Sequence, residues 1–255
     1  MQLSKAVALI TGGSQGFGKK FAESLLHLGA KVVIVDVDVA AGEKFQSDSI
    51  NQFGDNRLKF IKCDVTNSDE LLGTFDAAKD CFGHLDIVCN NAGIVSLDPR
   101  RTKAQVNTNV TAVMEGTFKG IELMGKQNGG HGGVIVNVAS AAGLDLMKGA
   151  PVYTATKHAV VAFSRSFKLL PYYKMDNIRV NCICPFFADT KMVRDGLALV
   201  PGGKKMVEQI GMVSIDDVGK GFMKCINDES MNGGVVVIAP PDKVFEMPFP
   251  KVNKL

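Results

Sequence analysis

The chain has 255 residues, 46% of them hydrophobic and 22% charged, which is typical of one large globular domain with a well-buried core. Its formal net charge of +3, with no long run of Lys or Arg, gives no basis for nucleic-acid binding. No apolar run reaches the roughly 18 residues that a membrane-spanning helix needs, so we expect no membrane span.

Strand-like and helix-like patterns alternate along the first half of the chain. Short apolar runs predict strands at residues 5–11, 31–36, 57–64 and 86–90. The run Val-Val-Ile-Val in the second of these has no polar alternation, which is typical of a parallel strand buried on both faces. Helical periodicity follows from Phe17 to Gly29, at residues 39–53 and at residues 68–82, where Ser68 is the expected N-cap.

The second half continues the alternation. We predict a long helix at 102–127, a glycine-rich loop at 128–133, a strand at 134–140, a helix from Pro151, a strand at 178–184, an irregular segment at 189–213, a helix at 214–227 and a strand at 234–239. The tail at 240–255 should be extended or loosely packed. This pattern predicts a single α/β domain over residues 1–255, a doubly wound Rossmann fold whose parallel sheet of about seven strands has helices on both faces.

A glycine-rich turn, Thr11 to Gly18, joins the first expected strand to the first expected helix. Glycines let the backbone approach a dinucleotide pyrophosphate, and the helix N-terminus offers free N–H groups. Asp36 ends the second strand, where a carboxylate can accept hydrogen bonds from ribose hydroxyls and would repel a 2′-phosphate. The sequence therefore predicts NAD rather than NADP, the alternative for Asp36 being a solvated charge at a strand end.

Tyr153 and Lys157 are four residues apart in an expected helix, so their side chains share one face. An ammonium beside a phenol favours the phenolate, and we expect Lys157 to lower the pKa of Tyr153 toward neutral pH. Asp64, Asn90–Gly93 and Ser140 end the third, fourth and fifth expected strands. Ligands bind at the carboxyl ends of strands in open α/β sheets, so these features should meet at one edge.

The motifs together resemble the short-chain dehydrogenase/reductase family over about residues 5–239. The resemblance is carried by Thr11–Gly18, Asn90–Gly93, Asn109, Ser140, Tyr153 and Lys157. Lys126–Gly130, Pro151–Tyr153 and Met231–Gly233 are similar to the branch that contains NAD-dependent 15-hydroxyprostaglandin dehydrogenase and its insect relatives. The resemblance implies an oxidoreductase that moves a hydride between NAD and a secondary alcohol or ketone on an apolar lipid, steroid or prostaglandin-like molecule.

The same resemblance implies residue roles. Tyr153 is the expected catalytic acid/base, Ser140 hydrogen-bonds to the substrate oxygen, Lys157 also holds the nicotinamide ribose, and Asn109 anchors a water in a proton relay. The expected cofactor-binding residues are Gly12, Ser14, Gln15, Gly16, Phe17, Gly18, Asp36, Val37, Cys63, Asp64, Val65, Asn91, Ala92, Tyr153, Lys157, Pro185, Phe187, Ala188 and Thr190. The expected substrate-binding residues are Ser140, Ala150 and Tyr153. Without the resemblance, Ser140 would be interpreted as a helix N-cap and Asn109 as a surface residue of a helix.

Three departures from the family keep alternatives open. Phe186 follows Pro185 where the family has glycine, a residue that tolerates positive φ. Ala150 stands near the position of a substrate-contacting glutamine, and the segment from Thr190 to Ser214, the expected substrate loop, is short. Phe186 favours a non-catalytic NAD-binding or storage relative as the second hypothesis. An NADPH-dependent carbonyl reductase is the third, and Asp36 opposes it.

Partners and location follow from composition and from the resemblance. The six cysteines show no zinc-ligand spacing and the N-terminus has no signal-peptide pattern, so we expect no metal and a cytoplasmic location. The resemblance implies a homodimer formed by the helices that begin at Thr102 and Pro151. Apolar residues beyond those that one sheet face requires support it, namely Val160, Val161, Phe163 and Phe167.

Overall fold

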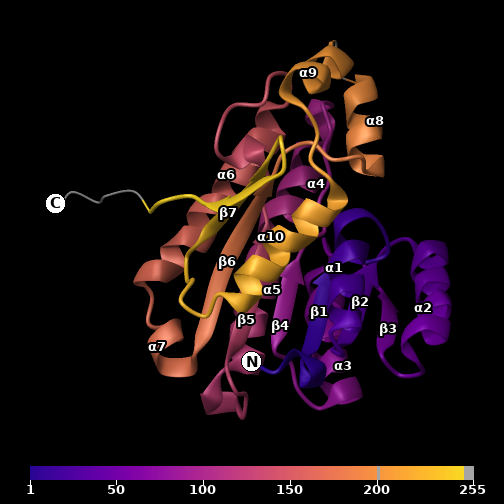
Figure 1. Ribbon diagram of the computed structural model, residues 1–255, viewed down its shortest axis with the longest axis vertical. Helices are drawn as coiled ribbons and strands as arrows, with labels where there is room; N and C mark the ends of the chain where they lie inside the picture. The colour runs from indigo at the N-terminus through magenta and orange to yellow at the C-terminus, as the bar shows by residue number, and fades with distance from the viewer. Residues whose placement is uncertain (200–201, 250–255) are drawn as a thin grey trace.

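A computed structural model describes residues 1–199 and 202–249 (Figure 1). Its strands are β1 Val7–Thr11, β2 Lys31–Asp36, β3 Leu58–Lys62, β4 Ile87–Asn90, β5 Gly133–Val138, β6 Ile178–Pro185, β7 Val235–Ala239 and β8 Lys243–Glu246. Its α-helices are α1 Gly16–His27, α2 Val39–Phe53, α3 Ser68–Phe82, α4 Thr102–Val106, α5 Ala112–Met124, α6 Pro151–Ser166, α7 Tyr172–Asp176, α8 Lys191–Leu199, α9 Gly203–Ile210 and α10 Ile215–Asn227.

The strands form one sheet in the order β3-β2-β1-β4-β5-β6-β7-β8. Neighbouring strands from β3 to β7 are parallel, which confirms the doubly wound fold, and β8 alone runs antiparallel to its neighbour β7. Since the parallel strands all point the same way, their carboxyl ends share one edge of the sheet. That edge lies beside α8 and α9 at the top of Figure 1. Ligands of open α/β sheets bind at the carboxyl ends of the strands, so the candidate site is expected there.

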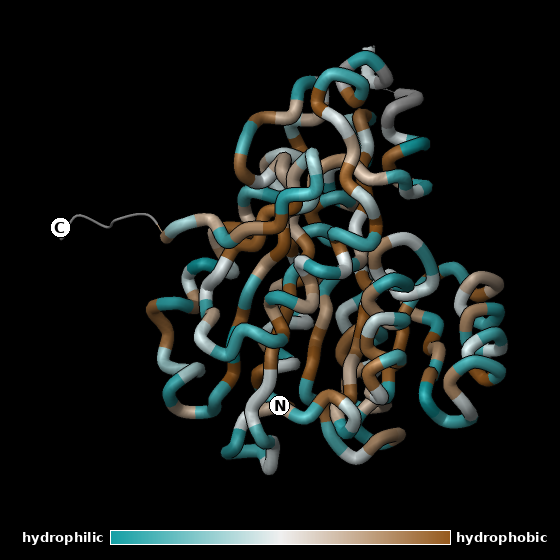
Figure 2. The backbone as a smooth tube through the Cα atoms, in the orientation of Figure 1, coloured by the Kyte–Doolittle hydropathy of each residue, from teal (hydrophilic) through white to brown (hydrophobic). Residues whose placement is uncertain are grey.

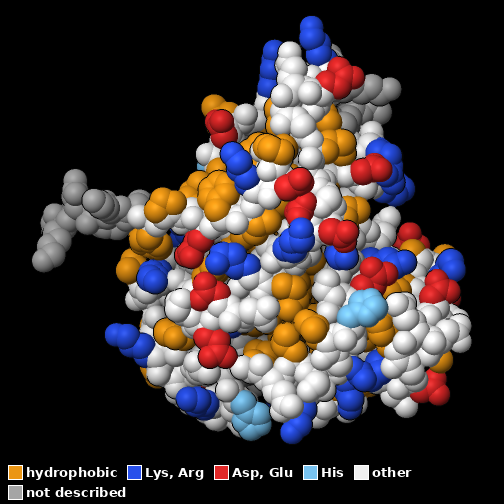
Figure 3. Space-filling model, in the orientation of Figure 1, with side chains coloured by type: hydrophobic (Ala, Val, Ile, Leu, Met, Phe, Trp, Pro, Cys, Tyr) orange, Lys and Arg blue, Asp and Glu red, His pale blue; other side chains and the backbone are white. Residues whose placement is uncertain are grey.

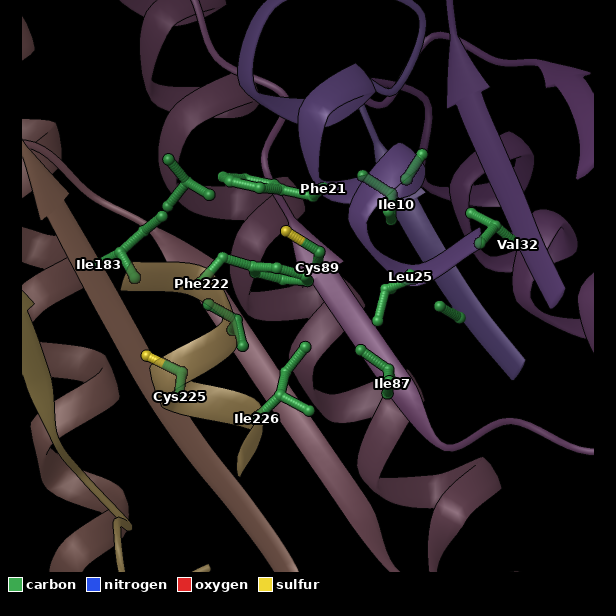
Figure 4. Close-up of a cluster of buried hydrophobic side chains, with 14 of the residues drawn as sticks. Ile10, Phe21, Leu25, Val32, Ile87, Cys89, Ile183, Phe222, Cys225 and Ile226 are labelled. Atoms are coloured by element: carbon green, nitrogen blue, oxygen red, sulfur yellow. The ribbon is translucent and has the colours of Figure 1, made fainter. Parts of the chain in front are cut away.

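Hydrophobic layers cover both faces of the sheet. On one face, α1, α2 and α10 pack against the strands, and the rings of Phe21 and Phe222 stack with their centres 4.4 Å apart (Figure 4). On the other face, α3, α5 and α6 bury side chains such as Phe75 and Met124. Figure 2 shows the hydrophobic strands running between helices whose outer sides are hydrophilic. Burial on both faces is why the strand sequences lack polar alternation.

Two segments are more regular than predicted. Residues 189–213 were expected to be irregular but contain α8 and α9, and the tail contributes β8, so the sheet has eight strands rather than seven. Val236 to Ala239 of β7 pair with Lys243 to Glu246 of β8. The open edge of β7 supplies the hydrogen bonds that make this short segment a strand, and no local pattern predicts that pairing.

Three element boundaries also differ from prediction. The N-cap of α3 is Asn67, whose side chain accepts from the N–H groups of Asp69 and Glu70, whereas Ser68 is the first helical residue. The long helix expected at 102–127 contains a π-helical turn at Asn107–Thr111 and ends at Met124. β5 ends at Val138, two residues before Ser140. Among the described residues, no helix is both long and apolar enough to cross a membrane.

Candidate active site

The glycine-rich turn has the geometry that a pyrophosphate requires. Gly12 and Gly16 have positive φ values of +63° and +56°, which side chains rarely adopt. A Cβ atom placed on Gly18 would lie 2.2 Å from the carbonyl oxygen of Gly12, so this close approach admits only glycine. Gln15, the N-cap of α1, makes no capping hydrogen bond through its side chain. The first N–H groups of α1 are therefore left to a ligand or to solvent.

Asp36 joins the end of β2 to this turn. Its Oδ2 accepts hydrogen bonds from the backbone N–H of Ser14 at 3.1 Å and from the Ser14 hydroxyl at 2.5 Å. Its Oδ1 accepts from the N–H of Asp38 at 3.1 Å. With 8% of its surface exposed, Asp36 is not a solvated strand-end charge. The carboxylate is fixed beside the turn, as a ribose-binding group requires.

Asn91 and Thr11 hold the turn against β4. The Asn91 side chain donates to the carbonyl oxygens of Thr11 at 2.8 Å and of Gly12 at 2.9 Å. The Thr11 hydroxyl in turn accepts from the N–H groups of Asn91 at 3.0 Å and of Ala92 at 3.1 Å. The Asn91 amide therefore shapes the turn. Thr11 was not among the predicted site residues, although it ends β1 in direct sequence with the glycines.

The other predicted cofactor residues lie near the same edge but differ in what they expose. Val37 is 60% exposed and Asp64 is exposed as well. The side chains of Cys63, Val65, Pro185 and Ala188 are buried, and burial raises the pKa of the Cys63 thiol to about 11. These four side chains therefore offer a cofactor little surface. Thr190 lies beside the turn, since its Cγ2 would be 3.7 Å from a Cβ placed on Gly16.

Tyr153 and Lys157 lie one turn apart on α6, and the Lys157 Nζ is 5.6 Å from the centre of the Tyr153 ring. Lys157 is 3% exposed, and its ammonium donates to the carbonyl oxygen of Val138 at 2.8 Å. A Cβ placed on Gly93 would lie 3.4 Å from Asn109 Oδ1 and 3.6 Å from Lys157 Nζ. Helix α6, the end of β5, the segment after β4 and the π-helical turn therefore meet at Lys157.

The prediction that Lys157 lowers the pKa of Tyr153 is wrong for this structure. Burial raises the pKa of Tyr153 above 10.0, and the nearby side chain of Ser140 lowers it only in part. Burial also lowers the pKa of Lys157 from 10.5 to about 8. Surroundings of low polarity disfavour the charged form of both groups, so they outweigh the mutual attraction that the spacing suggested.

Ser140 has the N-cap role of its alternative interpretation and also lies beside Tyr153, whereas Asn109 does not have the surface position of its alternative. The Ser140 hydroxyl does cap a short 3-10 helix, accepting from the N–H of Ala142 at 3.2 Å, and it also lies next to Tyr153. Asn109 is fully buried rather than on the surface. Its amide accepts from Ile94 N at 2.8 Å and donates to Ile94 O at 2.9 Å and to the Thr156 hydroxyl at 3.1 Å. Both amide hydrogens are therefore used within the protein, and the water-anchoring role of Asn109 stays a prediction.

The structure shows the surroundings of two departures from the family, Phe186 and Ala150. Phe186 is not among the residues with positive φ, so it carries none of the backbone strain that a replaced glycine could impose. Its N–H donates to the carbonyl oxygen of Ile238 at 2.9 Å, and its ring packs against hydrophobic side chains of the core. Ala150 is 1% exposed, and its carbonyl oxygen accepts from Thr154 N in the first turn of α6. It is therefore poorly placed to touch a substrate.

A buried polar network, which the sequence analysis missed, joins β4 and β5 to α6. Asn90 of β4 donates to the side-chain oxygen of Asn137 in β5 at 2.9 Å. Asn137 donates to the hydroxyl of Ser164 in α6 at 3.0 Å. These three side chains are at most 2% exposed, so their hydrogen bonds fix the strands and the helix relative to each other. The available signal was one asparagine at or near the end of each of two otherwise apolar strands.

A separate hollow of about 530 Å³ lies at the opposite edge of the sheet, lined by residues such as His84, Asp86, His131 and Arg179. None of the predicted catalytic residues lines it. Within residues 1–199 and 202–249, no three His, Cys, Asp or Glu side chains gather as metal ligands. The chemistry-bearing residues are thus concentrated at the carboxyl edge.

Comparison with known proteins agrees with this geometry. Residues 6–198 match the family model described as short chain dehydrogenase. The chain is 36% identical over 247 residues to 15-hydroxyprostaglandin dehydrogenase [NAD(+)] of Bos taurus, covering 93% of this chain and 92% of that protein. It is 35% identical over 190 residues to 3beta-hydroxysteroid dehydrogenase 2 of Eggerthella lenta, covering 72% of this chain and 71% of that one. The crystal structure of levodione reductase superposes with a TM-score of 0.83 at 27% identity, covering 92% of this chain and 96% of that chain.

Proposed function

Because this chain belongs to the short-chain dehydrogenase/reductase family, we propose that it is an NAD-dependent oxidoreductase that interconverts a secondary alcohol and a ketone on an apolar small molecule. The observation that carries the proposal is the meeting of Ser140, Tyr153 and Lys157 with the glycine-rich turn at one edge of the sheet. Relatives named for hydroxyprostaglandin and hydroxysteroid substrates support the substrate class. The proposal includes a cytoplasmic location and one domain over residues 1–255.

The residues at this edge divide the reaction between them. NAD, when bound, accepts the hydride that leaves the carbon bearing the hydroxyl group. Tyr153 takes the hydroxyl proton during oxidation and returns it during reduction, so the substrate loses one hydride and one proton in forming the ketone. Ser140 donates a hydrogen bond to the substrate oxygen and keeps it next to Tyr153. Lys157, one turn further along α6 and held by the carbonyl oxygen of Val138, binds the nicotinamide ribose and so places the cofactor beside Tyr153.

The cofactor assignment rests on the turn and on Asp36. The unfilled N–H groups at the start of α1 and the close backbone approach at Gly18 fit a pyrophosphate. The Asp36 carboxylate fits the ribose hydroxyls of NAD and disfavours a 2′-phosphate. Relatives named as NAD(+)-dependent support the same assignment.

We expect Asp36→Ala to weaken NADH binding by about tenfold or more and to narrow the gap between NADH and NADPH, because a charge-assisted hydrogen bond contributes about 1.5–3 kcal/mol. Asp36→Asn is the matched control, since an amide oxygen can still accept from Ser14 N while the charge is removed. Fluorescence titration of both cofactors measures the effect. Wild-type protein that binds NADPH as tightly as NADH would contradict the assignment.

An apolar substrate fits the side chains on the segments around the catalytic edge. Leu146, in the loop between Ser140 and α6, is 83% exposed. Met192 at the start of α8 and Met212 after α9 are 38% and 42% exposed. Figure 3 shows hydrophobic side chains gathered between the α9 end of the molecule and the C-terminal strand. Exposed apolar side chains grouped in this way are typical of a ligand-binding surface.

A screen of secondary alcohols with NAD tests the proposed function directly. The panel should include 2-alkanols of increasing length, 3-hydroxysteroids, hydroxy fatty acids and a 15-hydroxyprostaglandin, with NADH production as the readout. Enhanced NADH fluorescence without turnover of any alcohol would favour the non-catalytic NAD-binding relative. Absence of NADH binding would favour a storage protein and contradict the proposed NAD-dependent activity.

The homodimer remains part of the proposal, but its interface residues change. Val160, Val161 and Phe167, expected to supply surplus apolar surface, are buried in the core of the chain. Phe118 of α5 is instead 50% exposed, and its ring centre lies 5.7 Å from that of Phe163 in α6. Phe118 also lines a hollow of about 430 Å³ on α5. An aromatic side chain beside a hollow is suited to pairing with a second copy across a two-fold axis.

Light scattering at micromolar concentration should give twice the 27.3 kDa mass of one chain. Phe118→Asp should give the mass of one chain, because it places a charge in the centre of the interface. Ile50→Asp on α2 is the control, since Ile50 is 44% exposed and lies on the opposite face of the sheet. A wild-type mass of one chain would count against the dimer.

A further inference from the structure

Two fully buried amide side chains form hydrogen bonds with the backbone of the segment that follows β4. Gln105 of α4 accepts from the N–H of Ser96 at 3.1 Å and donates to the carbonyl oxygen of Ser96 at 2.9 Å. Asn109 of the π-helical turn makes the same pair of hydrogen bonds with Ile94, at 2.8 Å and 2.9 Å. Each amide therefore binds both backbone polar groups of one residue.

The spacing explains how the two amides act together. Gln105 and Asn109 are four residues apart, so they share one face of the helix. Ile94 and Ser96 are two residues apart, and in an extended chain such residues present their N–H and C=O groups to the same side. The helix face thus takes the place of a neighbouring strand. The Val95 N–H and C=O belong to the other side, and they take part in no hydrogen bond between described residues.

The segment held by the two amides lies between Lys157 and α8. It begins at Gly93, where a Cβ would lie 3.6 Å from Lys157 Nζ. At its centre, Val95 Cγ1 would lie 3.2 Å from a Cβ placed on Gly196 of α8. A displacement of this segment would therefore move the surface next to Lys157 and the support of α8 together.

We propose that Gln105 is a positioning residue of the active site, which with Asn109 holds residues 94–96 as a strand-like wall on the substrate side of Lys157. Gln105 itself touches neither cofactor nor reacting atoms; it acts through Ser96 and Val95. The outward peptide edge of Val95, which has no hydrogen-bond partner among the described residues, and the Val95 side chain form the surface against which the substrate packs. The inference rests on the proposed function for the identity of that substrate.

Gln105→Met tests the role, because methionine keeps the length of the side chain and makes no comparable hydrogen bond. Hydrogen exchange at the Ser96 amide should speed up by about tenfold or more, since its buried partner is lost. With 2-octanol as the probe, KM should rise on the order of tenfold while kcat changes much less, because positioning of the substrate is lost and the proton-transfer groups are intact. NADH binding should be unchanged.

Asn181→Leu is the matched control. Asn181 is also fully buried and makes a similar pair, donating to Met231 O at 3.0 Å and accepting from Gly234 N at 2.9 Å, with none of the catalytic residues as a partner. It should lower the melting temperature without moving KM. A second variant, Gln105→Glu, should resemble the wild-type protein when protonated, since a carboxylic acid can both donate to and accept from Ser96. Its KM relative to wild type should therefore rise with pH.

The inference is overturned if Gln105→Met leaves Ser96 exchange unchanged, or if its KM shift does not exceed that of Asn181→Leu. If the wild-type protein oxidises no alcohol, the proposed function fails separately. Binding of 2-octanone to the NADH-loaded protein, followed by NADH fluorescence, then replaces KM as the readout. If Gln105→Met leaves the affinity for the ketone unchanged, or if the protein binds no ketone at all, the proposed positioning role of Gln105 is contradicted.

Discussion

Tyr153→Phe should fold, bind NADH nearly as the wild-type protein does, and lose turnover by a factor of about 10² or more, the usual scale for general acid–base catalysis. Phenylalanine keeps the ring and its packing but removes the ionisable oxygen. Hydride cannot leave an alcohol carbon at low cost unless the hydroxyl proton also leaves. Ser140 is a poor base because no histidine lies among its hydrogen-bond partners, and Asp36 is committed to Ser14 and Asp38.

The raised pKa of Tyr153 adds a dependence on pH. The phenol, which is the favoured form at neutral pH, is the form that gives a proton to a ketone oxygen. Alcohol oxidation requires the phenolate, so its rate should rise as pH increases toward the pKa of Tyr153, while ketone reduction should fall. Tyr172→Phe on α7 is the matched control and should leave both rates unchanged. Wild-type turnover in Tyr153→Phe on a good substrate would show that the mechanism is wrong.

Lys157→Met should abolish most activity and weaken cofactor binding, yet it should make the protein more stable at pH 7. Lys157 is 3% exposed, and burial lowers its pKa from 10.5 to about 8. That lowering of the pKa corresponds to a cost of about 3 kcal/mol for keeping the ammonium charged in the folded protein. Loss of the hydrogen bond to Val138 offsets about 1 kcal/mol, which leaves a net gain of about 2 kcal/mol.

The sign of the pH dependence follows from proton binding. Between pH 8 and pH 10.5 the unfolded chain holds the Lys157 proton more tightly than the folded chain does. The free energy of unfolding of the wild-type protein should therefore rise relative to that of Lys157→Met as pH increases through this window. Near pH 10.5 the variant should no longer be the more stable of the two. Urea denaturation at pH 7 and pH 9.5 measures the difference. Lys157→Arg, which stays charged throughout, should be less stable than wild type at both values. A Lys157→Met variant whose stability relative to wild type is the same at both values would contradict the cause that we assign.

The sequence by itself determined the fold class and the edge at which the site is built. Apolar runs without polar alternation, separated by helical periodicity, leave few arrangements other than a parallel sheet with two helical layers. The glycine turn, Asp36 and the Tyr153–Lys157 spacing are local signals, because the chemistry that they serve requires particular residue types within a few positions of one another. Those signals are sufficient to place the candidate catalytic residues at one edge of the sheet.

Only the tertiary structure decided the features that depend on contacts between distant segments. β8 is a strand because β7 offers an open edge, and Val160 and Phe167 are core residues because of what packs on them. The pKa of Tyr153 rises because burial outweighs the hydrogen bond to Ser140, whereas the spacing to Lys157 alone suggested a lowered pKa. Gln105 gains its role from a segment nine residues upstream that folds back onto its helix. Burial and partnership are sums over the whole fold, so no window of sequence contains them.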